Sequence, residues 1–213
     1  MRMRKKPNLI PRMEKCAEVQ IKNPEEYKGK WRELLPGHES VYLELGCGKG
    51  KFTVETAKTL PETLLVAVER VPDAMVIGME RAVAEGIENV RFIDMDVSRL
   101  GEVFNASEVD RIYINFCDPW PKKRSAKRRL TSPLVLDIYR SILKPGGEIH
   151  FKTDNLPLFE YSVETLSSGG FELSEITNDL HKDGICGVMT DYEKKFYEQG
   201  IKINRLVATL RAD

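Results

Sequence analysis

Residues 118–129 combine an acid, two stiffening prolines and a dense run of cations. They read Asp-Pro-Trp-Pro-Lys-Lys-Arg-Ser-Ala-Lys-Arg-Arg and follow directly on the largely apolar run 112–117. Asp118 therefore lies at the tip of a predicted strand, a usual position for chemistry in an α/β fold. Clustered Lys and Arg on a loop are typical of phosphate binding. The combination indicates an enzyme that acts on nucleic acid; the alternative is a solvated basic loop without a partner.

A glycine-rich segment lies near the start of the chain. Residues 44–50 read Glu-Leu-Gly-Cys-Gly-Lys-Gly, between a predicted strand at 41–45 and a predicted helix at 51–60. Glycines let the backbone turn sharply and approach a ligand that a β-carbon would block. Lys51 stands where a dinucleotide-binding fingerprint has its third glycine, which argues against a dehydrogenase.

Acidic residues end the next two predicted strands. Glu69 lies 23 positions beyond Gly46, close to the spacing at which a carboxylate accepts both hydroxyls of a ribose. The alternative for Glu69 is a solvent-facing acid. Asp94 and Asp96 follow the third predicted strand, where a side chain can meet an adenine amino group. We expect one of these two only to cap the turn at Ser98.

Strands and helices alternate along most of the chain. Strands are predicted at 41–45, 64–68, 90–94, 111–116, 148–152, 171–176 and 204–210. Helices are predicted at 24–35, 51–60, 73–85, 98–104, 133–143 and 156–166. This alternation predicts a doubly wound three-layer α/β fold with a mostly parallel, seven-stranded sheet and an antiparallel final strand. Residues 1–22 are predicted to form a basic N-terminal arm that can be flexible, and residues 23–213 a single domain.

The composition is that of a soluble globular protein. The 213 residues are 41% hydrophobic and 31% charged, with a formal net charge of zero. Without the six cations of 122–129 the remainder carries a net charge of −6, so positive charge is local. Four widely spaced cysteines and three isolated histidines predict no zinc site and suit a reducing cytoplasm. No stretch has the character of a signal peptide or a membrane span, so no membrane partner is expected.

Several of these motifs resemble those of a known family. Glu-x-Gly-x-Gly-x-Gly, the acid after the second strand and Asp96 resemble the class I S-adenosylmethionine-dependent methyltransferases. The more specific run at 118–129 resembles the bacterial tRNA (guanine-N7)-methyltransferases, as do Lys-Thr-Asp-Asn at 152–155 and Thr-Asp-Tyr-Glu-Lys-Lys-Phe at 190–196. The resemblance covers roughly residue 40 to the end. It implies a Rossmann-like methyltransferase fold and methylation of the guanine at position 46 in the tRNA variable loop.

The resemblance also implies roles for individual residues. The expected cofactor-binding residues are Glu44, Gly46, Gly48, Gly50, Glu69, Asp96 and Asp118. Asp118 is also the expected catalytic acid. The expected substrate-binding residues are Lys122, Asp154, Thr190, Asp191, Tyr192 and Glu193. The expected RNA-binding residues are Arg124, Ser125, Ala126, Lys127, Arg128 and Arg129. Ser125 departs from the family pattern, in which members often carry His, and this bears on one RNA contact.

The chemistry of guanine N7 is consistent with this residue set. N7 carries a free lone pair that can attack a sulfonium methyl group without first losing a proton. We expect Asp118 to orient the base and to stabilise the positive charge that develops on it. Asp154 is suited to accept from guanine N1–H and the exocyclic amine, which excludes adenine. Trp120 either stacks on a base swung out of the RNA or packs beneath the loop, and we favour packing.

Two other functions fit parts of the pattern. Asp-Pro-Trp resembles the Asn/Asp-Pro-Pro-aromatic motif of methyltransferases that act on exocyclic amines, and the methylated atom separates that activity from N7 methylation. An RNA-binding module that keeps the fold without transferring methyl groups is the other alternative. The sequence leaves the oligomeric state open between a monomer and a homodimer.

Overall fold

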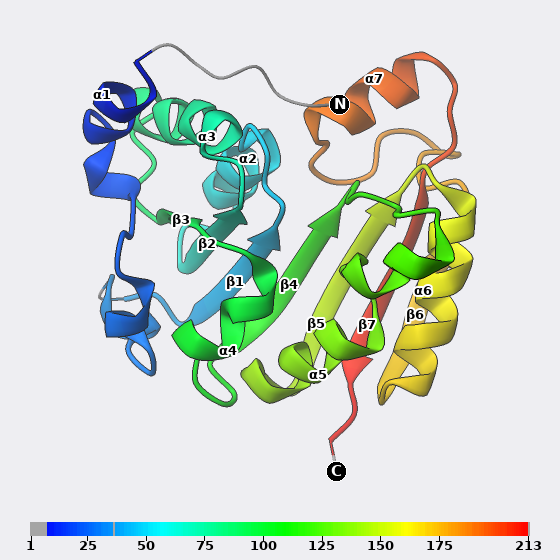
Figure 1. Ribbon diagram of the computed structural model, residues 1–213. Coiled ribbons are helices and arrows are strands. Elements are labelled where there is room, and N and C mark those ends of the chain that lie inside the picture. The colour runs from blue at the N-terminus through cyan, green and yellow to red at the C-terminus, as the bar shows by residue number, and fades with distance from the viewer. Residues whose placement is uncertain (1–7, 36, 213) are drawn as a thin grey trace. The chain divides into compact units, whose positions relative to one another are not determined.

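The computed structural model describes residues 8–35 and 37–212, and Figure 1 shows the arrangement of its elements. The strands in the described residues are β1 (Ser40–Leu45), β2 (Thr63–Glu69), β3 (Val90–Asp94), β4 (Val109–Asn115), β5 (Leu143–Thr153), β6 (Phe171–Thr177) and β7 (Asn204–Leu210). The helices are α1 (Leu9–Glu14), α2 (Lys51–Thr59), α3 (Pro72–Ala84), α4 (Leu100–Val103), α5 (Pro133–Ile142), α6 (Leu156–Ser168) and α7 (Asp191–Glu198).

The chain divides into two compact units, one up to Phe104 and one from Asn105 onwards. The strand order is β3-β2-β1 in the first unit and β4-β5-β7-β6 in the second, within the order of a seven-stranded sheet. The pairs β1–β2, β2–β3 and β4–β5 are parallel, whereas β7 is antiparallel to both β5 and β6. The predicted mostly parallel sheet with an antiparallel final strand is confirmed.

The core of the first unit lies between its strands and helices. Residues 64–68 of β2 are all buried, as expected for a central parallel strand covered on both faces. Helices α2 and α3 approach closely where Gly50 meets Gly78: a β-carbon on Gly50 would lie 2.6 Å from the Gly78 Cα. Glycine at both positions therefore permits backbone contact between the two helices.

Residues 8–22 lie within the predicted basic arm and pack against the rest of the first unit. Helix α1 lies beside α3 (Figure 1), and the Arg12 guanidinium donates two hydrogen bonds of 2.6 Å to the Glu80 carboxylate. Cys16 and Val19 are buried. Residues 1–7 lie outside the described residues, and the division of the chain into an arm and a single domain stays a prediction.

The helix predicted at 24–35 is wrong. Two short 3₁₀ turns, Pro24–Tyr27 and Trp31–Glu33, occupy this segment instead. Gly29 between them adopts a left-handed φ of 78°, which interrupts a right-handed helix. The indole N–H of the fully buried Trp31 donates to the Val103 carbonyl at 2.8 Å. Burial of the Trp31 side chain, a tertiary contact, therefore decides the conformation of this segment in place of a continuous helix.

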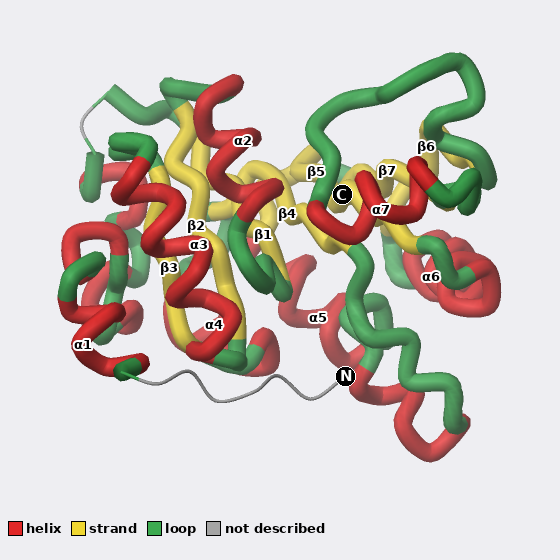
Figure 2. The backbone as a smooth tube through the Cα atoms, turned by 90° about the horizontal axis from the view of Figure 1, so that it is seen from above, coloured by secondary structure: helices red, strands yellow, loops and turns green. Residues whose placement is uncertain are grey.

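In the second unit, α5 and α6 lie on the same side of the strands (Figures 1 and 2). Helix α7 lies beyond the carboxyl end of β5 (Figure 1) and was not predicted as a helix. It begins with a capping box: Thr190 Oγ1 accepts from the Glu193 N–H, and the Glu193 carboxylate accepts from the Thr190 N–H. The spacing Thr-x-x-Glu at 190–193 is the sequence signal that indicates this helix start.

No helix in the described residues combines the length and the apolar character that a membrane crossing requires.

Candidate active site

In the first unit, the glycine loop follows β1 directly. The N–H groups of Gly46 and Cys47 both donate to the Val68 carbonyl, which holds the loop against the end of β2. Gly46 and Gly48 have left-handed φ values of 77° and 57°, and a β-carbon on either would meet no atom within 4 Å. The loop therefore exposes backbone on an open side, as the approach of a ligand requires.

Glu69 ends β2 and faces this loop. Its two carboxylate oxygens accept from the N–H groups of Gly48, at 3.0 Å, and Val71, at 2.9 Å. Burial raises the pKa of the Glu69 carboxyl above its usual 4.5, and the backbone hydrogen bonds partly offset that rise. Each oxygen keeps further acceptor capacity, so the carboxylate can still receive hydroxyl donors.

Glu44 and Asp96 also have partners within the first unit. Glu44 in β1 is buried and accepts from the Thr53 hydroxyl of α2. Asp96 Oδ1 accepts from the Ser98 N–H and hydroxyl, so Asp96 caps the turn that follows β3. Asp94 was the other candidate for that cap; its carboxyl pKa is raised because it is partly removed from water.

The first-unit residues fit S-adenosylmethionine. The loop offers glycines whose missing β-carbons leave space for a ligand, and Glu69 stands beside Gly48 with a carboxylate suited to ribose hydroxyls. The roles predicted for Glu44 and Asp96 at the cofactor stay predictions. Gly50 differs from Gly46 and Gly48 because it packs against Gly78 of α3 and does not face open space.

In the second unit, two predicted acids follow neighbouring strands. Asp118 comes after β4 and Asp154 after β5; both are exposed, and the strands are parallel with Asn115 opposite Lys152. The N–H of Phe116 continues the ladder to the Lys152 carbonyl at 2.9 Å. Parallel strands end at the same edge of a sheet, so the two carboxylates belong to one edge of this unit.

Within the basic run, Lys123–Arg128 forms a 3₁₀ segment. Lys122, Arg124, Lys127 and Arg128 are exposed, whereas Arg129 is half-buried. The Arg128 guanidinium lies 3.7 Å from the centroid of the Trp120 ring, and Trp120 itself is half-buried. Trp120 therefore packs against a cation of the run; stacking of Trp120 on a base stays a prediction.

The predicted substrate segment 190–193 is tied to β5 by buried side chains. Glu193 is fully buried and accepts from Lys152 Nζ at 2.7 Å. His181 Nε2 lies 3.1 Å from the other Glu193 oxygen, and the Cys186 N–H donates to His181 Nδ1. Sequence reasoning missed the partners of Glu193, since His181 is isolated in the sequence. Thr190 is buried, whereas Asp191 and Tyr192 are exposed and can meet a substrate.

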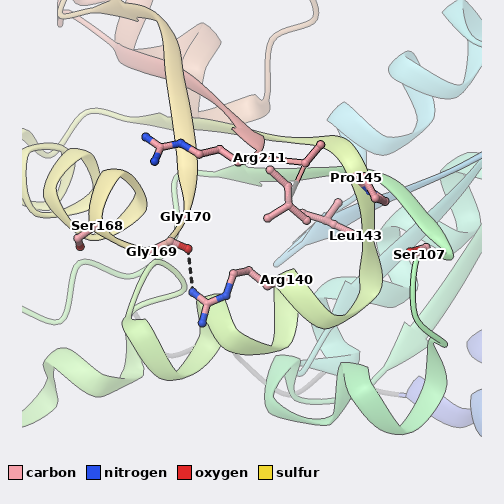
Figure 3. Close-up of a pocket in the computed structure, with 10 residues that line it drawn as sticks. Ser107, Arg140, Leu143, Pro145, Ser168, Gly169, Gly170 and Arg211 are labelled. Atoms are coloured by element: carbon pink, nitrogen blue, oxygen red, sulfur yellow. Dashed lines mark hydrogen bonds between the residues drawn. The ribbon is translucent and has the colours of Figure 1, made fainter.

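A cavity of about 870 Å³ lies at the other end of the second unit (Figure 3). It is lined by the ends of α5 and α6, the start of β5 and the end of β7, with the side chains of Arg140 and Arg211 on either side. Arg140 donates to the Gly169 carbonyl at 2.8 Å. None of the predicted site residues lines this cavity, and β5 separates it from Asp154, so it is not part of the candidate active site.

The sequence matches known proteins over nearly its whole length. A family model described as "Putative methyltransferase" matches residues 38–206. A tRNA (guanine-N(7)-)-methyltransferase of Clostridium tetani (strain Massachusetts / E88) is 45% identical over 212 residues, which cover 99% of this chain and 100% of the relative. The chain belongs to the tRNA (guanine-N(7)-)-methyltransferase family. A family member from Listeria monocytogenes serotype 4b (strain F2365) is 42% identical over 98% of both chains.

Solved structures share the family's fold. The 16S rRNA methyltransferase KamB is 18% identical, covers 86% of this chain and 94% of its own, and has a TM-score of 0.67. A variant of the 16S rRNA (adenine(1408)-N(1))-methyltransferase from Catenulisporales acidiphilia, solved with cosubstrate SAM, is 17% identical with a TM-score of 0.63, over 89% of this chain and 92% of its own. At these identities the likeness shows the Rossmann-like methyltransferase fold alone.

Proposed function

We propose that this protein transfers a methyl group from S-adenosylmethionine to N7 of the guanine at position 46 in the tRNA variable loop. The observation that carries the proposal is the 45% identity to a tRNA (guanine-N(7)-)-methyltransferase across 99% of the chain. Asp118 and Asp154, which follow neighbouring parallel strands, and the exposed cations beside them support a nucleic-acid base as the substrate. The free cysteines are consistent with the cytoplasm, where tRNA is modified.

In this proposal the first-unit residues bind the methyl donor. Gly46 and Gly48 leave room beside the loop, and Glu69 accepts the ribose hydroxyls. S-adenosylmethionine supplies a methyl group that is electrophilic because it is bonded to a positively charged sulfur. Glu44 and Asp96 complete the predicted binding set, and their existing partners Thr53 and Ser98 orient both carboxylates.

The second-unit residues bind and orient the guanine. The N7 lone pair forms the new N–C bond as the S–C bond breaks, and the electron pair of that bond goes to sulfur. No proton leaves, so the product guanine is positively charged and no activated protein nucleophile is required. Asp118 orients the base and stabilises this charge. Asp154 accepts from the donors on the Watson–Crick edge, which excludes adenine.

The RNA reaches these residues with one base swung out of its fold. Exposed cations at 122–128 bind phosphates beside the base. The exposed Asp191 and Tyr192 at the start of α7 contact the substrate, and Glu193 is expected to act through Lys152 and His181 because it is fully buried.

The test is methyl transfer from labelled S-adenosylmethionine to unmodified tRNA, followed by strand cleavage specific for N7-methylguanosine. Cleavage at position 46 is the expected result. Label incorporated without cleavage assigns the enzyme to exocyclic-amine methylation. Bound tRNA with no incorporated label leaves an RNA-binding protein on a methyltransferase fold, and either result overturns the proposal.

A further inference from the structure

Arg129 ends the basic run, but its side chain points into the loop that carries Asp118. Its Nε donates to the Pro119 carbonyl at 3.0 Å, and its Nη2 donates to the Trp120 carbonyl at 3.2 Å. The guanidinium carbon lies 4.3 Å from the centroid of the Tyr161 ring of α6. The Arg129 guanidinium is planar, and its three contacts connect the loop that carries Asp118 to α6.

The loop that Arg129 contacts has an unfavourable backbone. Phe116 and Trp120 adopt left-handed φ values of 53° and 42°. Bulky residues rarely adopt this unfavourable conformation, which persists only where surrounding contacts impose it. The carbonyl of Trp120 is one of the two that Arg129 binds. Arg129 therefore contacts the loop at one of its two left-handed residues.

A second contact closes the loop on the other side of Asp118. The backbone of Leu130 lies beside the Cys117 sulfur and favours its ionised form, which partly offsets the effect of burial. Removal of this sulfur from water is the main cause that raises the pKa of the Cys117 thiol to about 12, and the nearby Asp118 charge adds to the rise. Asp118 thus lies between two positions that meet the end of the basic run, Cys117 beside Leu130 and Pro119 bonded to Arg129.

The other cations of the run are placed differently. Arg124, Lys127 and Arg128 are exposed, and Arg128 stacks on the outer part of the loop through the Trp120 ring. Arg129 is half-buried with its donors directed at main-chain carbonyls. Arg129 N–H groups that donate to carbonyls of the same chain are poorly available to phosphates. The basic run therefore contains exposed cations, which can bind RNA, and one guanidinium that is bonded within the protein.

We propose that Arg129 is a positioning residue that holds the 116–120 loop, and with it Asp118, in the orientation that methyl transfer needs. The proposal rests on the proposed function, because its kinetic test measures methyl transfer. The role expected from sequence was a contact with RNA. The two roles differ in what they require: a phosphate contact needs positive charge, whereas the loop needs a flat group with two donors in fixed directions.

The decisive comparison is Arg129→Lys against Arg124→Lys, each beside its alanine variant. Lysine keeps the charge but cannot bind both carbonyls and stack on Tyr161. We expect Arg129→Lys and Arg129→Ala to lower kcat by a similar factor, up to about 100-fold, as misplacement of a catalytic group does. We expect Arg129→Lys to keep the KM for tRNA and the salt dependence of binding. At Arg124, alanine lowers the salt slope by about one and lysine preserves it.

A structural readout accompanies the kinetics. The protein has two tryptophans, and Trp31 is fully buried, so quenching by acrylamide reports Trp120. Arg129→Lys is expected to increase quenching of Trp120, whereas Arg124→Lys leaves it at the wild-type value. Free ethylguanidinium is expected to restore part of the rate of Arg129→Ala. Thermal melting checks that both Arg129 variants are folded at the assay temperature.

The proposal is overturned if Arg129→Lys keeps the wild-type kcat. It is also overturned if Arg129→Ala lowers the salt slope of tRNA binding without lowering kcat. Either result would return Arg129 to the RNA-binding residues. Unchanged Trp120 quenching in both Arg129 variants overturns it as well. If the wild-type protein fails to methylate tRNA, the proposed function fails, but the quenching experiment still tests the loop contact.

Discussion

Glu193 and Lys152 form an ion pair that is closed to water. Lys152 Nζ lies 2.7 Å from Glu193 Oε2, and the two side chains are 10% and 0% exposed. Lys152 Nζ also donates to the Val188 carbonyl at 3.1 Å, and Glu193 accepts from His181 and from the Thr190 N–H. This network attaches the start of α7, where the exposed Asp191 and Tyr192 lie, to the end of β5.

Glu193→Gln tests the network. Glutamine keeps the shape but leaves Lys152 buried without its counter-charge, which costs about 3–5 kcal/mol. We expect the free energy of unfolding in urea to fall by this amount. The control is Lys194→Ala on the same helix, whose pair with Glu198 is exposed and 4.0 Å long, and which should change stability by less than about 0.5 kcal/mol. Equal effects of the two variants would contradict the assignment.

Three glycine-to-alanine variants separate packing from ligand binding. Gly50, Gly48 and Gly86 all have left-handed φ values, of 67°, 57° and 63°. A β-carbon at Gly48 or Gly86 meets open space, so each variant should lose only the conformational cost of about 1–2 kcal/mol. Gly50→Ala should lose clearly more because of the contact with Gly78. Urea unfolding measures all three.

The same variants test the predicted cofactor loop. We expect Gly48→Ala to weaken binding of S-adenosylmethionine, measured by calorimetric titration, whereas Gly86→Ala leaves the affinity at the wild-type value. Gly86 lies after the end of α3 and is remote from the loop in sequence. Equal affinity in the two variants would show that the open side of Gly48 does not face the ligand.

The ionisation of the Glu69 carboxyl should make cofactor binding depend on pH. In the proposed function, ribose hydroxyls donate to the ionised Glu69 carboxylate. The affinity for the cofactor should then be constant at neutral pH and fall about tenfold per pH unit below the Glu69 pKa. Because burial raises that pKa above 4.5, the loss begins at a higher pH than for an exposed glutamate. The same shift means that the folded state favours the protonated carboxyl, so this contribution to stability is present at low pH and lost as pH rises.

Glu69→Gln should bind S-adenosylmethionine more weakly and without this pH dependence. Titrations between pH 5 and neutrality, with circular dichroism to check that the protein stays folded, measure both. A pH profile that is the same in the variant and the wild type would assign the titration to another group.

Asp118→Asn tests the charge of the predicted catalytic acid. Asparagine has the same shape but cannot stabilise the developing cation, so kcat should fall by about 10²–10³-fold while tRNA affinity is kept. Single-turnover methylation and filter binding measure the two quantities. Asp137→Asn, on the exposed side of α5 and outside the site, is the control and should keep wild-type kcat. Near-normal turnover in Asp118→Asn would remove Asp118 from the mechanism.

The four cysteines should differ in reactivity. Cys16 and Cys47 are buried with raised pKa values, and the pKa of Cys117 is about 12, so few of these thiols ionise at pH 8. Cys186 is exposed. Ellman's reagent should therefore modify one thiol rapidly in the folded protein and the remaining three only in denaturant. Cys186→Ser should abolish the fast phase; a fast phase that persists would mean that one of the other three thiols is accessible in the folded protein.

Local sequence patterns were sufficient for the order of the strands and for the acids at their ends. They placed the start of the fifth strand wrongly, because β5 begins at Leu143, where a helix end and a turn were predicted. Residues 64–68 of β2 are apolar because both faces of the strand are covered. Glu69 ends β2, and Asp118 and Asp154 follow β4 and β5, strands whose ends the hydrophobic pattern marks. The helix predicted at 24–35 was wrong because its cap and first-turn proline were strong local signals, whereas burial of Trp31 is a tertiary effect.

The sequence by itself determined the order of strands and helices, the glycine loop and the positions of the acids, because each depends on neighbouring residues. Only the tertiary structure decided that Arg129 turns inward and that Glu193 is buried. Glu193 meets Lys152 from 41 positions away, and Arg129 reaches α6 through Tyr161. Such contacts join segments that only folding brings together, so two adjacent arginines with the same charge, Arg128 and Arg129, come to have different surroundings.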